Sequence, residues 1–313
     1  MLPVVHHSVY AARIPTQRRF PTSKYLRLIE VLRDEGIASA ANTIAPKPVS
    51  CATLERAHKF SYVYAVVNQS LDQAAVRRIG FPVTAGLIRR TRHSIGGTIS
   101  AGELALEHGL ACNTAGGSHH AHADFGAGYC VFNDVAVAIR ALQAKALIAT
   151  AWVIDLDVHQ GDGTAEIFSD DESVQTFSMH CEANFPAQKK RSDIDLGLPS
   201  GTGDEDYLQR LERCLDDLFA KPGPDIVFYN AGVDPHAEDR LGRLQLSDAG
   251  LAERDRYVVA RCRARGLPVA CVVGGGYSDD VDVLARRHAI LYRTAAAIAE
   301  QEKPEFANRQ IIS

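Results

Sequence analysis

The sequence predicts an α/β fold in which helices cover both faces of a central, mostly parallel sheet. Its strand candidates are short and apolar throughout, as strands buried on both faces usually are. They alternate along the chain with amphipathic helical segments, the order expected of parallel strands joined by helices. No repeat, linker or low-complexity block interrupts this pattern. We therefore expect one domain over residues 1–313, with a core from about 20 to 300 and a polar tail at 301–313.

Length and composition exclude several classes of function. The 313 residues, 46% of them hydrophobic, are enough to bury a large core. A net charge of -4 without a basic stripe argues against direct nucleic-acid binding. The N-terminus lacks the features of a signal peptide, and no apolar run approaches the roughly 18 residues of a membrane span, so we expect no membrane contact and a cytoplasmic location. Seven cysteines without CxxC pairing predict reduced thiols and no disulfide.

The N-terminal third predicts one strand and several helical segments. Thr22 is a candidate cap for a first helix, which the apolar spacing carries to Gly36. A later helix is expected to begin after Gly96-Gly97 and to end at Gly109, with small residues that indicate close packing. The other segments are a strand at Val4-Val5, an irregular loop from Arg13 to Pro21, a stretch broken by prolines at 42–50, and helical pieces over 51–92 with a break at 80–82.

The remainder of the chain alternates strands and helices more regularly. Residues 112–134 read as a loop of glycine and histidine that enters a helix near Asn133. Asp204 and Ser247 are candidate caps of two amphipathic helices, which end before Pro222 and at Gly266. The strand candidates are the apolar start of 151–163, then 174–179, 225–229 and 269–273, and a last helix is expected at about 281–299.

The stretch 151–163, AWVIDLDVHQGDG, predicts a metal site. If the chain stays extended there, Asp155, Asp157 and His159 share one face of the strand. Burying carboxylates without partners costs several kcal/mol or forces protonation, so a cation is expected. Asp234, at the end of another strand, completes a set of two carboxylates and one histidine, which leaves coordination positions free as a catalytic zinc site does. Each residue alone also fits a turn or a helix cap, but three strand ends converging at one sheet edge favour the metal.

Two adjacent histidines supply candidate acid/base groups. His119 and His120 follow two glycines that permit close backbone approach, and Asp155 and Asp162 are available to orient the two rings. A histidine beside a water that a metal activates is an arrangement for general acid/base catalysis. The other adjacent pair, His6-His7, is expected to be an accidental surface pair.

Tyr277 follows three glycines at a strand end and has two readings. It is either a core aromatic that packs after a turn, or a hydroxyl donor to an oxygen that becomes negative in the transition state. A metal, an acid/base histidine and an oxyanion donor, without a serine or cysteine nucleophile, predict metal-assisted hydrolysis of a carbonyl compound.

Five motifs in this order resemble those of the histone deacetylase family. They are GGSHHA (116–121), GYCVFND (128–134), DLDVHQGDG (155–163), NAGVD (230–234) and GGGY (274–277). The resemblance runs from about Phe20 to His288. The glutamine in VHQGDG and the segment LGRL (241–244) look most like the class IV branch and its bacterial relatives.

The resemblance implies an arginase-like fold and a zinc-dependent enzyme that removes acyl groups from N-acyl-lysine. Carried over by motif, the metal ligands would be Asp157, His159 and Asp234. His120 would be the general base and His119 its electrostatic partner, held by Asp162 and Asp155, and Tyr277 would polarise the acyl carbonyl. The substrate tunnel would use Gly128, Tyr129, Phe185 and Leu241. A structural potassium site would use Asp155 with backbone oxygens near Asp157, His159, Ser178 and Met179.

Several alternatives stay open at this point. The substrate is an acylated lysine of a protein or peptide, or a small amine such as an acylated polyamine, and the acyl chain can be short or long. Iron can replace zinc in an Asp/His site. A binuclear manganese ureohydrolase and a non-catalytic acyl-lysine binding module are the competing functions, and the oligomeric state is not indicated. The charged segment Glu238-Asp239-Arg240 is expected near the tunnel mouth, where no carboxylate that would hold a substrate backbone is identifiable.

Overall fold

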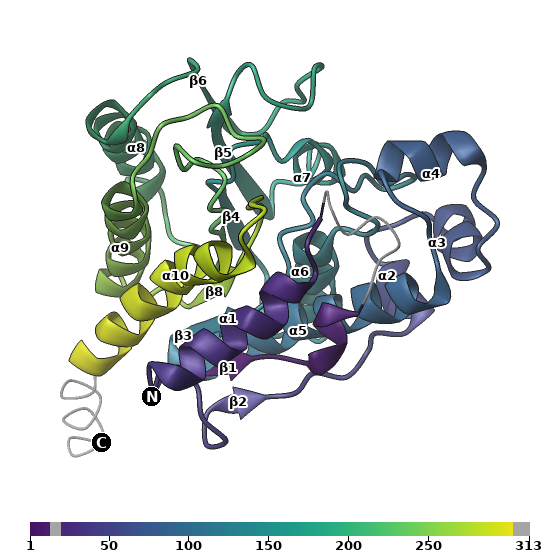
Figure 1. The fold of residues 1–313 in the computed structure, drawn as a ribbon, viewed down its shortest axis with the longest axis horizontal. Helices are drawn as coiled ribbons and strands as arrows, with labels where there is room; N and C mark the ends of the chain where they lie inside the picture. Colours follow the sequence, from purple (N-terminus) through teal and green to yellow (C-terminus); the bar gives the residue numbers. More distant parts are fainter. Residues whose placement is uncertain (13–19, 303–313) are drawn as a thin grey trace.

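The computed structural model describes residues 1–12 and 20–302, and their strands form one parallel sheet (Figure 1). The described part contains eight strands in the order β2-β1-β3-β8-β7-β4-β5-β6, and every neighbouring pair is parallel. The predicted α/β architecture is therefore confirmed, with a sheet that is parallel throughout. The strands are β1 (Val4–Val5), β2 (Thr43–Ile44), β3 (Leu110–Asn113), β4 (Ala151–Asp155), β5 (Val174–Cys181), β6 (Ile194–Leu198), β7 (Ile226–Asn230) and β8 (Val269–Val272).

Helices connect these strands and cover both faces of the sheet. Helices α1, α8, α9 and α10 pack on one face, and α5 and α6 pack on the other, with α2, α3 and α4 beyond them (Figure 1). The helices are η1 (Ser8–Ala11), α1 (Ser23–Asp34), α2 (Cys51–Leu54), α3 (Phe60–Val67), α4 (Gln73–Ile79), α5 (Ala85–His108), α6 (Asp134–Ala144), α7 (Asp162–Ile167), α8 (Asp204–Phe219), α9 (Asp248–Ala264) and α10 (Val281–Gln301). Among the described residues, every helix is too short or too polar to span a membrane.

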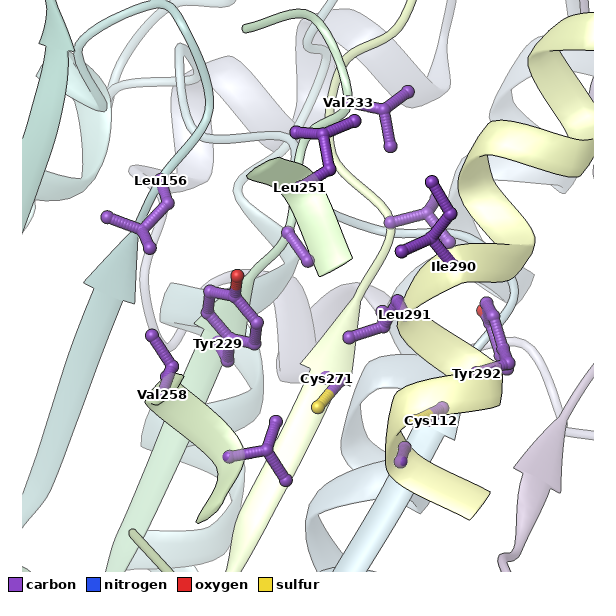
Figure 2. Close-up of a cluster of buried hydrophobic side chains, with 14 of the residues drawn as sticks. Cys112, Leu156, Tyr229, Val233, Leu251, Val258, Cys271, Ile290, Leu291 and Tyr292 are labelled. Atoms are coloured by element: carbon purple, nitrogen blue, oxygen red, sulfur yellow. The ribbon is translucent and has the colours of Figure 1, made fainter. Parts of the chain in front are cut away.

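Strand alternation divides the core into two layers. In β4, Trp152 and Ile154 belong to the layer under α8, α9 and α10, whereas Val153 belongs to the layer under α5 and α6. Figure 2 shows the first layer, where side chains of β3, β7 and β8 meet those of α9 and α10. Cys112 and Cys271 lie there as buried thiols, and all seven cysteines are free, as predicted. Full burial of each large apolar side chain contributes about 1.5–3 kcal/mol to folding.

Helix α5 is longer than the sequence predicts. It begins at Ala85 and passes through Gly96 and Gly97, so the expected start after these glycines is wrong. Their role is to allow close packing inside the helix. A Cβ on Gly96 would lie 2.0 Å from the Lys47 carbonyl oxygen, and one on Gly97 would lie 2.1 Å from the Tyr10 hydroxyl. The close approach of these groups leaves no room for a side chain, so glycine is required at both positions although it costs roughly 1 kcal/mol inside a helix.

Three short strands and two helix caps also differ from expectation. The strands β2, β3 and β6 are not among the predicted strands. Two of them, β2 and β6, are edge strands, and β3 runs directly into the glycine-histidine loop. Thr22 occupies the cap position of α1 without a side-chain capping bond. Asp204 is the first residue of α8, and its carboxylate accepts hydrogen bonds from Ser247 instead. Most of the expected 13–21 loop and of the polar tail lies outside the described residues.

A buried arginine fixes the ends of two central strands. Arg254 of α9 is fully buried and pairs with Asp255. It donates hydrogen bonds to the carbonyl oxygen of Leu156, just after β4, at 3.2 Å and to that of Gly232, just after β7, at 2.6 Å. A guanidinium suits this position because it stays charged and offers several donors in one plane. The two loops that leave β4 and β7 are thereby held in one geometry.

Candidate metal centre and active site

The predicted site residues gather at the carboxyl edge of the four central strands. Asp157 and His159 follow β4, Asp234 follows β7, and Tyr277 follows β8. The histidine pair follows β3, which lies next to β8 in the sheet. Loops that are distant in sequence therefore meet, as expected at the carboxyl ends of neighbouring parallel strands.

Three buried side chains converge on one point of this edge. His159 Nδ1 lies 3.0 Å from Asp157 Oδ1 and 3.1 Å from Asp234 Oδ2, and all three side chains are at least nine-tenths buried. Each carboxylate is fixed through its other oxygen. Asp157 Oδ2 accepts from the Gly275 amide at 2.6 Å, and Asp234 Oδ1 accepts from the Val158 amide at 2.9 Å. Two carboxylate oxygens and one ring nitrogen remain directed at a shared point.

The backbone does not stay extended along this stretch. Strand β4 ends at Asp155, and the next residues form an irregular turn, so the expected single strand face is wrong. Asp155 pairs with His119, whereas His159 pairs with Asp157 and Asp234. Because the turn and not the strand period brings the ligands together, this geometry was not accessible from spacing alone.

The electrostatics of the three residues indicate a site for a cation. Burial acts to lower the pKa of His159, but its hydrogen bonds to Asp157 and Asp234 and their charges more than reverse this and raise it to about 10. Burial and repulsion by Asp157 raise the pKa of Asp234 to about 7. The proton on His159 thus supplies positive charge between the two carboxylates. The set of one nitrogen and two carboxylate ligands fits a divalent ion such as zinc, which takes three protein ligands in catalytic sites.

The two neighbouring histidines are held by separate carboxylates. His119 Nδ1 lies 2.7 Å from Asp155 Oδ2, and His120 Nδ1 lies 2.6 Å from Asp162 Oδ1. Burial lowers the pKa of His119, but Asp155 and Asp157 outweigh it and raise the value to about 9. Burial and repulsion by His119 lower the pKa of His120 to about 4. At neutral pH His120 is therefore a neutral ring beside a cationic one, and its Nε2 is available to accept a proton.

Two further residues support these carboxylates, and the sequence argument assigned neither a role. Asn230 lies opposite Asp155 in the sheet and donates to its Oδ1 at 2.9 Å. His122 Nε2 lies 3.1 Å from the second oxygen of Asp162. Asn230 is the first residue of NAGVD, and His122 directly follows GGSHHA. Their positions beside the predicted site residues were the sequence feature that could have identified them.

The loop that carries the histidine pair is anchored to α6 and to a distant histidine. The Asp134 carboxylate accepts from the backbone amides of Gly117 and Ser118 at 3.1 and 2.7 Å. His58 Nδ1 donates to the His122 carbonyl oxygen at 2.9 Å, and its Nε2 accepts from the Asn133 amide at 3.0 Å. His58 lies in a segment whose function the sequence does not indicate, so no local signal identified it.

The N-terminal histidine pair is not the accidental surface pair that the sequence suggests. His6 is buried, and its Nδ1 lies 2.7 Å from Thr114 Oγ1. His7 is partly buried and accepts from the Val9 amide at the start of η1. The expectation fails because β1 lies inside the sheet beside β3, which places the residue after it under the neighbouring loop.

One cavity of about 440 Å³ joins the metal-site residues to the surface. Its inner wall includes His120, His159 and Tyr277. Burial and nearby carboxylates raise the pKa of Tyr277 well above its usual value, so its phenol is a neutral donor. All four residues predicted for the substrate tunnel line this same cavity: Gly128, Tyr129, Phe185 and Leu241.

The charged segment expected at the mouth of this cavity is engaged elsewhere. The Asp239 carboxylate accepts from the backbone amides of Tyr277, Leu241 and Gly242, and Glu238 pairs with Arg287. Arg240 pairs with Asp279. The segment therefore adjoins the cavity through Leu241, but none of the residues 238–240 lines it. The charged residues that do line it are Arg77, Arg78 and Arg243.

Comparison with known proteins gives consistent matches over most of the chain. Residues 18–293 match the model of the histone deacetylase domain. The chain is 50% identical to an uncharacterised protein of Picosynechococcus, with 94% of this chain and 98% of that one covered. It is 31% identical to histone deacetylase 2 of Arabidopsis thaliana, over 88% and 75% of the two chains. A solved histone deacetylase homologue complexed with SAHA superposes with a TM-score of 0.81 at 25% identity, covering 95% and 84% of the chains, which confirms the predicted fold.

The contacts of His58 predict a pH-dependent stability. Burial lowers its folded-state pKa to about 4, whereas the unfolded value is 6.5. Between these values the unfolded state binds more protons, so the free energy of unfolding should fall as pH drops from 6.5 to 4, by about 3 kcal/mol for this group. Denaturant unfolding at several pH values should show a shallower decline in His58→Gln. A matched change of the exposed His108 to Gln should keep the native profile, and an unchanged profile in His58→Gln would contradict the assignment.

The different contacts of Asp157 and Asp155 predict that one substitution removes the metal and the other lowers turnover. Asp157→Ala removes an oxygen directed at the metal point, so metal content should fall close to zero. Asp155→Asn keeps the size of the side chain but removes the negative charge that pairs with His119. Metal content should therefore stay close to native while turnover falls by about 10–100-fold. Elemental analysis and rate measurement on both variants make the comparison. Equal metal loss in both would show that Asp155 is itself a ligand.

Proposed function

This chain belongs to the histone deacetylase family, whose members are hydrolases of amide bonds, and we propose that it removes short acyl groups from N-acyl-lysine. The observation that carries the proposal is the position of a neutral His120 and a neutral Tyr277 beside the metal triad, at the inner end of one cavity. A non-catalytic binding module would not require a proton acceptor and an oxyanion donor beside the ligands.

Asp157, His159 and Asp234 would hold the ion, for which we propose zinc. Bound there, a zinc ion would lower the pKa of a water towards about 7 and polarise the acyl carbonyl. Iron binds similar ligand sets and stays an alternative. Among the described residues, only these three side chains form a group able to hold a metal, which supports one ion rather than the pair that a binuclear ureohydrolase needs.

The residues around the triad would move the protons. His120 Nε2 accepts the proton of the attacking water and later delivers it to the lysine nitrogen as the amide bond breaks. Asp162, which accepts from Nδ1 of the same ring, keeps Nε2 directed into the site. Tyr277 donates a hydrogen bond to the acyl oxygen as it becomes negative, and the His119 cation stabilises the same charge. The Gly128 carbonyl is proposed to accept the N–H of the scissile amide.

The size of the inner cavity favours a short acyl group. A smaller cavity of about 40 Å³ shares Tyr277 with the main cavity and is also lined by His119, Asp157 and Gly275. This space is small beside the roughly 440 Å³ of the main cavity. A narrow space beside the metal-site residues suits an acetyl group better than an octanoyl chain. We therefore propose deacetylation in preference to long-chain deacylation.

Four finer features complete the proposal. Ser178 lies opposite Asp155 in the β4–β5 register, which supports a potassium site on Asp155 and nearby backbone oxygens. Gln160, the residue whose identity suggests the class IV branch, donates hydrogen bonds to the Lys190 carbonyl oxygen and to Asp195. These bonds give it a fixed structural role. A single domain over 1–313 and a cytoplasmic location are retained as predictions.

The proposal predicts losses of turnover without loss of metal. His120→Ala removes the proton acceptor and Tyr277→Phe removes the oxyanion donor, so each should lower turnover by at least about 100-fold with native metal content. On a panel of acyl-lysine peptides, the native enzyme should cleave acetyl at least about tenfold better than octanoyl or myristoyl by kcat/KM. Native rates in both variants would overturn the assigned roles, and a preference for octanoyl would overturn the acyl assignment.

A further inference from the structure

The mouth of the active-site cavity is cationic although the protein as a whole is anionic. Arg77, Arg78 and Arg243 line the cavity, and within the described residues no aspartate or glutamate does. All three side chains are exposed, in a chain of net charge -4. A substrate that enters this cavity therefore passes a local excess of positive charge.

Two of these arginines are attached to the wall that carries Gly128. They lie at the end of α4, where the Arg78 carbonyl oxygen accepts from the Gly128 amide at 3.2 Å. The next residue continues the pairing, because the Ile79 carbonyl oxygen accepts from the Tyr129 amide at 2.8 Å. The Arg78 guanidinium also packs over the ring of Phe125, at 4.6 Å from its centroid. The cationic end of α4 is thus a fixed part of the tunnel wall.

The third arginine is fixed to the wall that carries Phe185. The backbone amide of Arg243 donates to Asn184 Oδ1 at 3.1 Å, and Asn184 Nδ2 donates to the Leu241 carbonyl oxygen at 2.7 Å. The loop of Arg243 and the loop of Phe185 are therefore joined by one side chain. Positive charge is built into two separate segments that surround the same opening.

We infer that the preferred substrate carries carboxylates next to its acyl-lysine, and that Arg77, Arg78 and Arg243 select them; this inference rests on the proposed function. An exposed pair of opposite charges changes binding by only about two- to fivefold, so three together give a preference of about tenfold or more. An acylated polyamine would instead bring ammonium groups towards three guanidinium groups. The same charges thus disfavour the small cationic amines that the chemistry alone leaves open.

The carboxylates can come from two sources, which the experiment separates. One is an acidic side chain that flanks the acyl-lysine in a peptide, and the other is the α-carboxylate of free Nε-acetyl-lysine. The substrates are acetyl-lysine peptides that differ only in flanking Asp, Gln or Lys residues, free Nε-acetyl-lysine with its carboxylate or its amide, and an acetylated polyamine.

In the native enzyme, Asp-flanked peptides should exceed Lys-flanked ones by about tenfold in kcat/KM at low salt, mostly through KM. The ratio should shrink as salt rises from about 50 to about 300 mM, because the charges are exposed and become screened. The variant with Arg77→Glu, Arg78→Glu and Arg243→Glu should prefer Lys-flanked to Asp-flanked peptides.

The matched control is Arg213→Glu on α8, at the opposite end of the molecule from α4 (Figure 1), which should keep the native preference for Asp-flanked peptides. Single changes to Gln replace the triple variant if it does not fold.

The outcomes separate this inference from the proposed function. Hydrolysis of all peptides at equal rates, or a preference for Lys flanks or for the polyamine, would overturn the inference and leave the hydrolase intact. Binding is measured independently by fluorescence anisotropy of labelled peptides on the His120→Ala variant. Selective binding of Asp-flanked peptides there, lost on reversing the three arginines, would support the inference even if the native enzyme released no acetate.

Discussion

The structure depends on the need for positive charge at a sheet edge where four aspartates are buried. Asp155 pairs with the cationic His119, and Asp162 binds His120 and also His122, whose pKa it raises. Asp157 and Asp234 share His159, and burial with repulsion by Asp157 raises the pKa of Asp234 to about 7. Leaving charged carboxylates uncompensated inside a protein costs several kcal/mol. The fold therefore favours a bound cation at one defined point, and the catalytic groups lie around that point.

The rest of the molecule keeps this point rigid. Arg254 ties together the ends of β4 and β7, from which all three ligands emerge, and its permanent charge compensates Asp255 rather than the metal ligands. Asp134 and His58 hold the loop of the histidine pair. Because each ligand and each catalytic ring is fixed by a partner from another element, the site is organised before substrate arrives, which is what electrostatic catalysis requires.

The parallel sheet and the convergence of Asp157, His159 and Asp234 could be predicted because strand ends and polar motifs are local features of the sequence. Other features depend on distant contacts. Helix α5 continues through Gly96 and Gly97, where Lys47 and Tyr10 pack closely against it, and His58 acquires its role by reaching the loop at His122 and Asn133. The cationic mouth arises because α4 and the loop of Arg243 line the same cavity, and neither segment carries a recognisable pattern. The charged segment 238–240 adds no residue to the cavity lining, and the Asp239 carboxylate is held by backbone amides instead.

The central claim is that one divalent ion, held by Asp157, His159 and Asp234, serves amide hydrolysis. Titrating zinc into the metal-free protein while following acetate release from an acetyl-lysine peptide tests it most directly. The rate should rise linearly to one equivalent per chain and then stay constant, because a single set of three ligands is present among the described residues. A rate that keeps rising to two equivalents, or full activity without added metal, would contradict the account.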